Sequence, residues 1–130
     1  MTQLTLEKPG DHHFVRSVDE EGIRIGDTLY TDGLLLSATT LQEDWGPAEL
    51  EALSDTDLES VLALKPEVIL LGTGRTQQFL HPSRLAPCYR AGVGIELMTT
   101  DAACRTFNVL ASEGRQVVAA LLPIADSARG

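Results

Sequence analysis

The chain has 130 residues, which fits one domain, and its net charge of −9 excludes sequence-independent nucleic-acid binding, which needs a basic face. Hydrophobic residues make up 43% of the sequence and aromatic residues only 5%, so we expect a mainly aliphatic core. Its few large members should be Trp45, Phe14, Phe79 and Phe107.

The N-terminus and the cysteines predict a cytoplasmic protein. No apolar run approaches the roughly 20 residues of a membrane span, so we expect no direct membrane insertion. Residues 1–13 lack both the regions of a secretory signal and the arginines of a mitochondrial presequence. In the reducing environment that follows, Cys88 and Cys104 are expected to be free thiols, since the sequence holds neither a C-x-x-C pair nor a disulfide framework.

Charge is distributed unevenly along the chain. Residues 1–65 contain 14 acidic and 4 basic residues, whereas residues 66–130 contain 5 acidic and 6 basic residues. The acidic half favours solubility, and the second half leaves local positive potential for a small anion.

The first third of the chain reads as a β meander. Short apolar runs at residues 13–18, 23–25, 28–30 and 34–37 are separated by turns rich in glycine and acidic residues, which is the pattern of hairpins. Residues 40–53 then predict a loop or a short strand.

A short helix should follow this irregular segment. Residues 54–57 resemble a capping box, and Leu58, Val61 and Leu62 have the spacing of one helical face. Pro66 is expected to end the helix.

Beyond residue 66 the pattern changes to alternating strands and helices. Residues 68–71, 95–98 and 116–122 read as strands, and residues 82–92 and 100–114 read as the helices between them. Right-handed crossovers would make the three strands parallel, so the sequence predicts an α/β fold.

The domain boundaries follow from these elements. We expect a single α/β domain over residues 12–122, flanked by a flexible N-terminus (1–11) and a flexible tail (123–130).

The last helix has two distinct stripes, with Thr99 or Thr100 as its N-cap. The stripe expected to face the sheet consists of Ala103, Phe107, Leu110 and Gly114. The stripe expected to face solvent or a groove consists of Asp101, Arg105, Asn108 and Ser112.

A polar pocket is predicted where the first parallel strand ends and this helix begins. Open α/β sheets bind ligands outside the carboxyl ends of their strands, and a helix N-terminus there favours an anion. The candidate pocket residues are Gly72, Thr73, Gly74, Met98, Thr99, Thr100, Arg105 and Asn108. Two alternatives remain open: the glycines could serve only a tight turn, and Arg105 could serve only an ion pair with Asp101.

The motifs indicate no particular chemistry. The glycine loop lacks the spacing of a P-loop, and Gln77 replaces the last glycine of a dinucleotide fingerprint. Cys104 has no nearby histidine, and His81 would have to act from afar, so a buried thiol is favoured over a nucleophile. The pair His12-His13 lacks a third spaced ligand for zinc. We therefore expect no cofactor, no metal and no catalytic residue.

Several spaced motifs carry a family resemblance. They are the strand with Gly72-Thr73-Gly74, residues 92–100, residues 102–110 and Glu113-Gly114-Arg115. Together they resemble the complex I assembly factor 3-like family of small α/β domains, whose members are mostly of unknown function. The resemblance covers roughly residues 12–122.

The resemblance implies a three-layer fold with a central mixed sheet and a small β layer from the N-terminal meander. The mitochondrial member of the family helps to assemble the peripheral part of NADH:ubiquinone oxidoreductase through contacts with other proteins. The family supplies no agreed catalytic residue, and from residues 1–13 we expect no presequence like that of the mitochondrial member.

Three functional hypotheses follow. The first is a non-catalytic accessory protein, related to respiratory complex I assembly, whose partners are other proteins of unknown identity. The second is a binding module or enzyme that takes a small anionic metabolite or nucleotide in the predicted pocket. The third is a dimer whose groove is only an interface, in which Glu96 marks an exposed strand edge.

Overall fold

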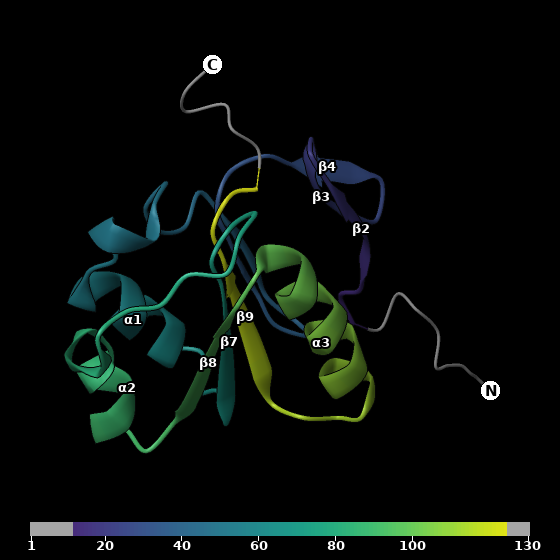
Figure 1. Ribbon diagram of the computed structural model, residues 1–130. Coiled ribbons are helices and arrows are strands. Elements are labelled where there is room, and N and C mark those ends of the chain that lie inside the picture. The colour runs from purple at the N-terminus through teal and green to yellow at the C-terminus, as the bar shows by residue number, and fades with distance from the viewer. Residues whose placement is uncertain (1–11, 125–130) are drawn as a thin grey trace.

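The computed structural model describes residues 12–124, which form three layers (Figure 1). Helices α1 (Asp55–Leu62) and α2 (Ala86–Arg90) cover one face of a central five-stranded sheet. Helix α3 (Thr100–Ser112) and a small three-stranded sheet cover the other face. The flexibility expected of residues 1–11 and of the tail 123–130 concerns residues that, apart from Pro123 and Ile124, lie outside the described part of the chain.

The central sheet is mixed, with the strand order β6-β5-β9-β7-β8. Strand β7 pairs in parallel with both β8 and β9, whereas β5 is antiparallel to β6 and β9. The predicted α/β class and the three predicted parallel strands are therefore confirmed. The strands are β5 (Leu34–Leu36), β6 (Leu41–Glu43), β7 (Val68–Gly72), β8 (Gly94–Met98) and β9 (Val117–Leu121).

The small sheet is an antiparallel meander of β2 (Val15–Asp19), β3 (Gly22–Ile25) and β4 (Thr28–Tyr30). The expectation that residues 34–37 continue this meander is wrong, because β5 joins the central sheet. All three leucines of β5 are at most 1% exposed. A strand with no polar side needs a sheet that is covered on both faces, and only the central sheet offers this.

Helices α1 and α3 begin where the sequence predicts, whereas α2 begins at Ala86, four residues after the expected start at residue 82. The capping box of α1 is present: Ser54 Oγ accepts from Asp57 N at 3.1 Å, and Asp57 Oδ2 accepts from Ser54 N at 3.0 Å. Residues 40–53 contain strand β6 and a 3₁₀ turn, η2 (Leu50–Ala52). The crossover after β7 consists of a 3₁₀ turn, η3 (Pro82–Leu85), followed directly by α2. Within residues 12–124, no helix is long and apolar enough to cross a membrane.

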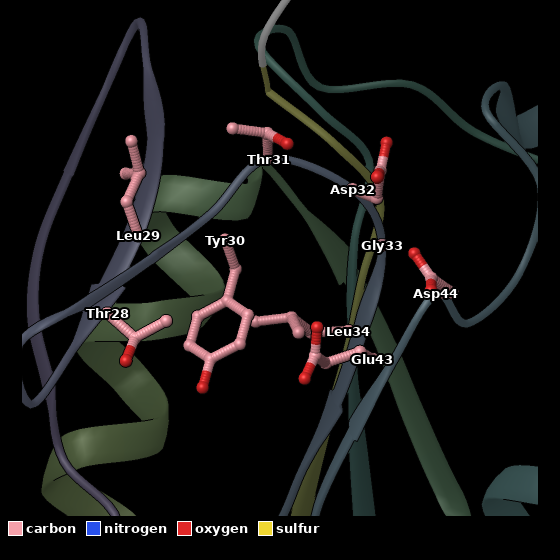
Figure 2. Close-up of a pocket in the computed structure, with 9 residues that line it drawn as sticks. All are labelled: Thr28, Leu29, Tyr30, Thr31, Asp32, Gly33, Leu34, Glu43 and Asp44. Atoms are coloured by element: carbon pink, nitrogen blue, oxygen red, sulfur yellow. The ribbon is translucent and has the colours of Figure 1, made fainter.

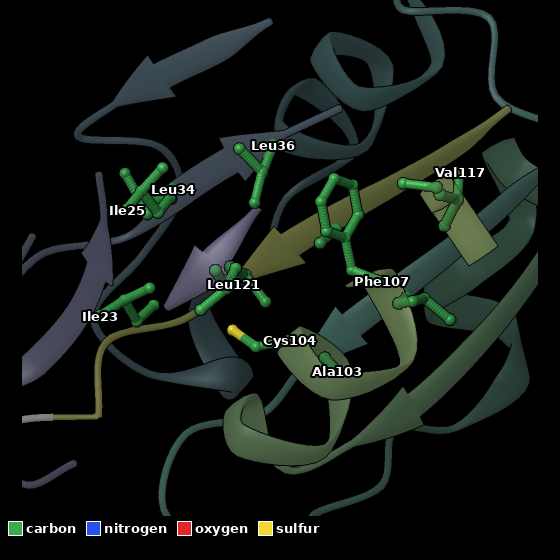
Figure 3. Packing of buried hydrophobic residues seen from close by; sticks show 13 residues of the cluster. Ile23, Ile25, Leu34, Leu36, Ala103, Cys104, Phe107, Val117 and Leu121 are labelled. Carbon is green, nitrogen blue, oxygen red and sulfur yellow. The ribbon is translucent and has the colours of Figure 1, made fainter. Parts of the chain in front are cut away.

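The core is divided by the central sheet into two clusters, because alternate residues of each strand point to opposite faces. In β9, Val117, Ala119 and Leu121 belong to the cluster under α3 (Figure 3). Val118 and Ala120 belong to the cluster under α1 and α2. Both faces of this strand are apolar, as expected for a strand buried between helices.

Only two of the four aromatic residues assigned to the core are buried. Trp45 is 3% and Phe107 0% exposed, and Trp45 Nε1 donates to Ser60 Oγ at 2.9 Å. Phe14 and Phe79 are 48% and 74% exposed, so their assignment to the core is wrong. Composition alone cannot separate these pairs, since burial depends on whether a neighbouring element covers the side chain.

The sheet-facing stripe of α3 is confirmed for Ala103 and Phe107, both 0% exposed, and Leu110 packs partly buried against the same cluster. Gly114 is exposed beyond the end of the helix, where it adopts a positive φ of 80°, so its place in the stripe is wrong. Cys104 adds to the buried side of the helix, between the two predicted stripes.

Candidate functional site

The end of β7 and the start of α3 meet in very close contact. A Cβ built on Gly72 would lie 2.9 Å from both Cα and Oγ1 of Thr100, and 3.1 Å from a methyl group of Leu121. No larger residue fits at position 72 unless the helix moves. The strand therefore ends in glycine because the helix backbone occupies the place of a side chain.

Thr100 is the hydrogen-bonding centre of this junction. Its side-chain Oγ1 accepts from Gly74 N at 2.9 Å and donates to Leu122 O at 2.9 Å, and the residue is 0% exposed. Its own N–H donates to Gly74 O at 2.9 Å, and Leu122 N donates to Gly72 O at 2.9 Å. Three chain segments are thus joined by bonds that use the buried polar groups of each.

Thr73 secures the chain as it leaves the strand. Its N–H donates to Met98 O at 2.8 Å, and its side-chain Oγ1 donates to Thr76 O at 2.7 Å. The residue is only 2% exposed, although it lies in the loop where a ligand contact was predicted. The hydroxyl groups of Thr73 and Thr100 therefore both donate to backbone oxygens within the protein.

Thr99 is the N-cap of α3, as predicted. Its Oγ1 accepts from Ala102 N at 3.1 Å, and its carbonyl accepts from Ala103 N at 2.9 Å. These contacts use part of the positive end of the helix, where an anion would otherwise find backbone donors.

The structure brings six of the eight candidate pocket residues together at this junction. Arg105 and Asn108 lie farther along α3 and serve other contacts. Arg105 is 70% exposed at its side chain and pairs with Asp101 at 3.3 Å, which is the ion pair considered from the sequence. The Asn108 amide accepts from Val15 N and donates to Val15 O, both at 2.9 Å, and so fastens the small sheet to α3.

The two cysteines are buried free thiols. Burial raises the pKa of the Cys104 thiol to about 12; the Asp101 carboxylate adds to this rise and Arg105 opposes it. Burial also raises the pKa of Cys88. Because the thiolate is the reactive form, neither residue is arranged as a nucleophile.

Sequence reasoning missed two hollows at the small sheet. One has a volume of about 120 Å³, and Figure 2 shows Asp32 and Asp44 on one side of it and Thr28 and Leu29 on the other. Within residues 12–124, no group of three His, Cys, Asp or Glu side chains could hold a metal ion. No motif marks these hollows, because each is lined by residues of both the small sheet and the central sheet.

The second hollow is larger, about 490 Å³, and its lining is mostly apolar. Ile25, Tyr30 and Leu41 contribute apolar surface, and Phe14 and Arg16 stand among its exposed residues. His13 is fixed at its wall, where its ring Nδ1 lies 2.9 Å from Ser37 O. Its shape comes from packing between two sheets, which the sequence pattern alone does not specify.

The fold and this closed junction define a small α/β domain built on a five-stranded mixed sheet with a separate β meander. Residues 15–122 match the family described as a protein of unknown function (DUF498/DUF598), and the chain belongs to this family. This confirms the resemblance found in the sequence motifs.

Known relatives cover most of the chain. A mouse protein named NADH dehydrogenase (ubiquinone) 1 alpha subcomplex assembly factor 3 is 31% identical over 113 residues, which are 85% of this chain and 60% of the mouse protein. A Francisella tularensis protein named 13 kDa major membrane protein is 34% identical over 89 residues, 68% of this chain and 72% of that protein. A crystal structure from Bordetella parapertussis superimposes with a TM-score of 0.81 at 34% identity, covering 86% of this chain and 96% of that one.

Proposed function

We propose that this protein is a non-catalytic accessory factor that binds other proteins during the assembly of a respiratory NADH dehydrogenase. The observation that carries the proposal is the 31% identity with the mouse assembly factor across 85% of this chain. The proposal assigns the role to a cytoplasmic domain at residues 12–122, the segment that the family match spans almost entirely.

The hydrogen bonds at the junction support a role in protein contact. Thr73 and Thr100, the buried polar residues of the described core, direct their hydroxyl groups to Thr76 O and Leu122 O. A ligand that used these hydroxyls would have to break bonds inside the protein, which costs free energy before any is gained. The exposed aromatic side chains of Phe14, Phe79 and Tyr89 take no part in these bonds, so contact with them carries no such cost.

A small-molecule site at the eight candidate residues stays a prediction and is the less favoured hypothesis. Thermal-shift measurements with a panel of nucleotides and organic phosphates test it directly. Saturable stabilisation that is lost in Arg105→Ala would support the pocket, and we expect no such stabilisation.

Deletion of the gene from its own host tests the assembly role. Membranes of the deletion strain are separated on native gels and stained for NADH dehydrogenase activity, and succinate dehydrogenase serves as the control complex. We expect the assembled NADH dehydrogenase to fall several-fold and to return when the full-length protein is restored. Unchanged assembly in the deletion strain would refute the proposal.

A further inference from the structure

The central sheet of the described chain ends on one side in strand β8 (Figure 1). The strand order β6-β5-β9-β7-β8 leaves β6 and β8 at the two edges. The pairing of β8 with β7 runs without a break from Gly94 to Met98. The opposite side of residues 94–98, here called the β8 edge, is the side to which a further strand could bond. An edge strand presents a row of backbone donors and acceptors there, and proteins protect such edges unless they are used.

The backbone groups at the β8 edge can be identified from the hydrogen bonds around it. Met98 O accepts from Thr73 N at 2.8 Å, so the backbone groups of Met98 point to the β7 side. Because this direction alternates along a strand, the groups of Ile95 and Leu97 point outward. In agreement, Leu97 O accepts from the side-chain Nε2 of Gln77 at 3.2 Å, at the place where the N–H of an added strand would donate. Ile95 N–H, Ile95 O and Leu97 N–H face the same space.

The other three strand edges of the described chain are less suited to an added strand. β4 and β6 contain three residues each, and short edges offer few bonds. β2 has five residues, but its register shifts between Val15 and Ser17, and such a bulge disrupts the ladder. β8 has five residues in an unbroken register. Within residues 12–124 it is therefore the longest regular edge.

The side chains of β8 indicate which strand the edge can accept. Ile95, Leu97 and Met98 pack partly buried against the two cores. Glu96 is exposed and takes part in none of the ion pairs found among residues 12–124. A second copy of β8, paired antiparallel so that Ile95 bonds to Leu97 of the other chain, would place two Glu96 carboxylates opposite each other. Like charges in this position are destabilising, so the edge disfavours self-pairing and favours a strand with a basic side chain there.

We propose that the β8 edge binds an extended segment of a partner protein as an added strand, with a lysine or arginine of that segment opposite Glu96. This rests on the proposed assembly function, so the partner is a subunit of the NADH dehydrogenase. Strand addition gains affinity from main-chain hydrogen bonds and specificity from the side chains that alternate along the strand. At Leu97 O the partner's N–H replaces the Gln77 amide, which exchanges one hydrogen bond for another.

Two variants of Ile95 in the full-length protein test the backbone contact in the deletion strain. Ile95→Pro removes the outward N–H, and the ladder to β7 is kept because this N–H points away from β7. Ile95→Ala is the matched control, since it loses the same side chain but keeps the N–H. We expect Ile95→Pro to restore about tenfold less assembled NADH dehydrogenase than Ile95→Ala. The purified variants should melt at similar temperatures, so that loss of assembly is not loss of folding.

A second pair of variants tests the charge contact without changing the backbone. Glu96→Lys reverses the charge at the β8 edge, and Glu59→Lys makes the same change at an exposed position on α1. We expect Glu96→Lys to lower the assembled NADH dehydrogenase several-fold and Glu59→Lys to leave it at the wild-type amount. Equal restoration by the two variants would mean that Glu96 only prevents self-pairing, and would overturn the basic partner strand.

Photo-cross-linking from Gly94 identifies the partner strand. A Cβ added at Gly94 would meet no atom of the described chain within 4 Å outside the neighbouring residues, so benzoylphenylalanine fits there, on the same face of β8 as Glu96. The same residue at position 59 is the control, and products are identified by mass spectrometry. We expect an NADH dehydrogenase subunit to be linked at position 94 and not at position 59, and the product to be lost in Ile95→Pro. A link from position 94 to a second copy of this chain would overturn the partner strand.

The outcomes separate the β8 edge from the assembly function. If deletion impairs assembly and both Ile95→Pro and Glu96→Lys restore it fully, the β8 edge is refuted while the assembly function stands. If deletion leaves assembly intact, the assembly function is refuted. In that case a protein that is linked at position 94, and is lost in Ile95→Pro, would support the edge with a different partner. The absence of any such product would refute the edge as well.

Discussion

The junction at the end of β7 and the loop that follows it are adjacent in sequence but opposite in character. At the junction, Thr73 and Thr100 are 2% and 0% exposed, and their polar groups bond within the protein. A few residues later Phe79 is 74% exposed and apolar. The comparison teaches that the strand end, where α/β proteins usually bind small ligands, is used here to fix the fold. The apolar side chain of Phe79 next to it is exposed to solvent.

The largest expected effect is a difference in the free energy of unfolding between variants of two phenylalanines. Phe107→Ala should lower the free energy of unfolding by about 4 kcal/mol, because it empties the centre of the core under α3. Phe79→Ala should change it by less than about 0.5 kcal/mol, since the ring contacts mainly solvent. Urea unfolding of both variants measures the difference, and similar losses would show that Phe79 also supports the fold.

The next largest effect on stability is expected when the hydrogen bonds of the junction are removed. Thr100→Val keeps the shape of the side chain but leaves Gly74 N and Leu122 O buried without their partner. We expect the free energy of unfolding to fall by about 2–3 kcal/mol in Thr100→Val. The fall should be smaller in Thr100→Ser, which keeps the hydroxyl. Equal losses in the two variants would mean that the methyl group, and not the hydrogen bonds, matters at this position.

A smaller effect is expected at Asn108, which the sequence assigned to the pocket. Asn108→Ala removes both hydrogen bonds to Val15 and should cost about 1–2 kcal/mol, while amide hydrogen exchange rises in β2 before it rises in β7. Ser112→Ala is the matched control, because Ser112 Oγ only donates to Val109 O within the helix. If exchange in β2 stayed unchanged, the amide would not fasten the small sheet.

The smallest effect lies at the other end of β7 and depends on pH. Hydrogen bonds from Gln116 N at 3.2 Å and from Arg115 Nε at 2.9 Å lower the pKa of Glu67 below its usual value of 4.5. The carboxylate form is therefore favoured in the folded state, so its contribution to stability is present above pH 4.5 and is lost as the pH falls through the lowered pKa. Unfolding curves of wild type and Glu67→Gln should converge in acid, and a constant difference between them would contradict this.

Much of the fold could be predicted because its signals are local. The capping box at Ser54 and Asp57, the N-cap at Thr99 and the apolar run of β7 each lie within a few residues of the element that they define. The proximity of the end of β7 to the start of α3 was predicted, but the contacts made there were not, and a ligand site at this place stays a prediction. The strand end and the helix start do meet, yet Asn108 bonds to a residue 93 positions away, which no periodicity indicates.

The sequence by itself determined the types and order of the elements, the parallel arrangement of β7, β8 and β9, and the absence of disulfide spacing, since these depend on neighbouring residues and on chain handedness. Tertiary structure decided that β5 leaves the meander, that Thr100 bonds to Gly74 and Leu122 across the junction, and that Phe79 remains outside the core. The physical reason is that burial and hydrogen-bond partners depend on segments that are distant in the chain and become neighbours only when the sheet has formed.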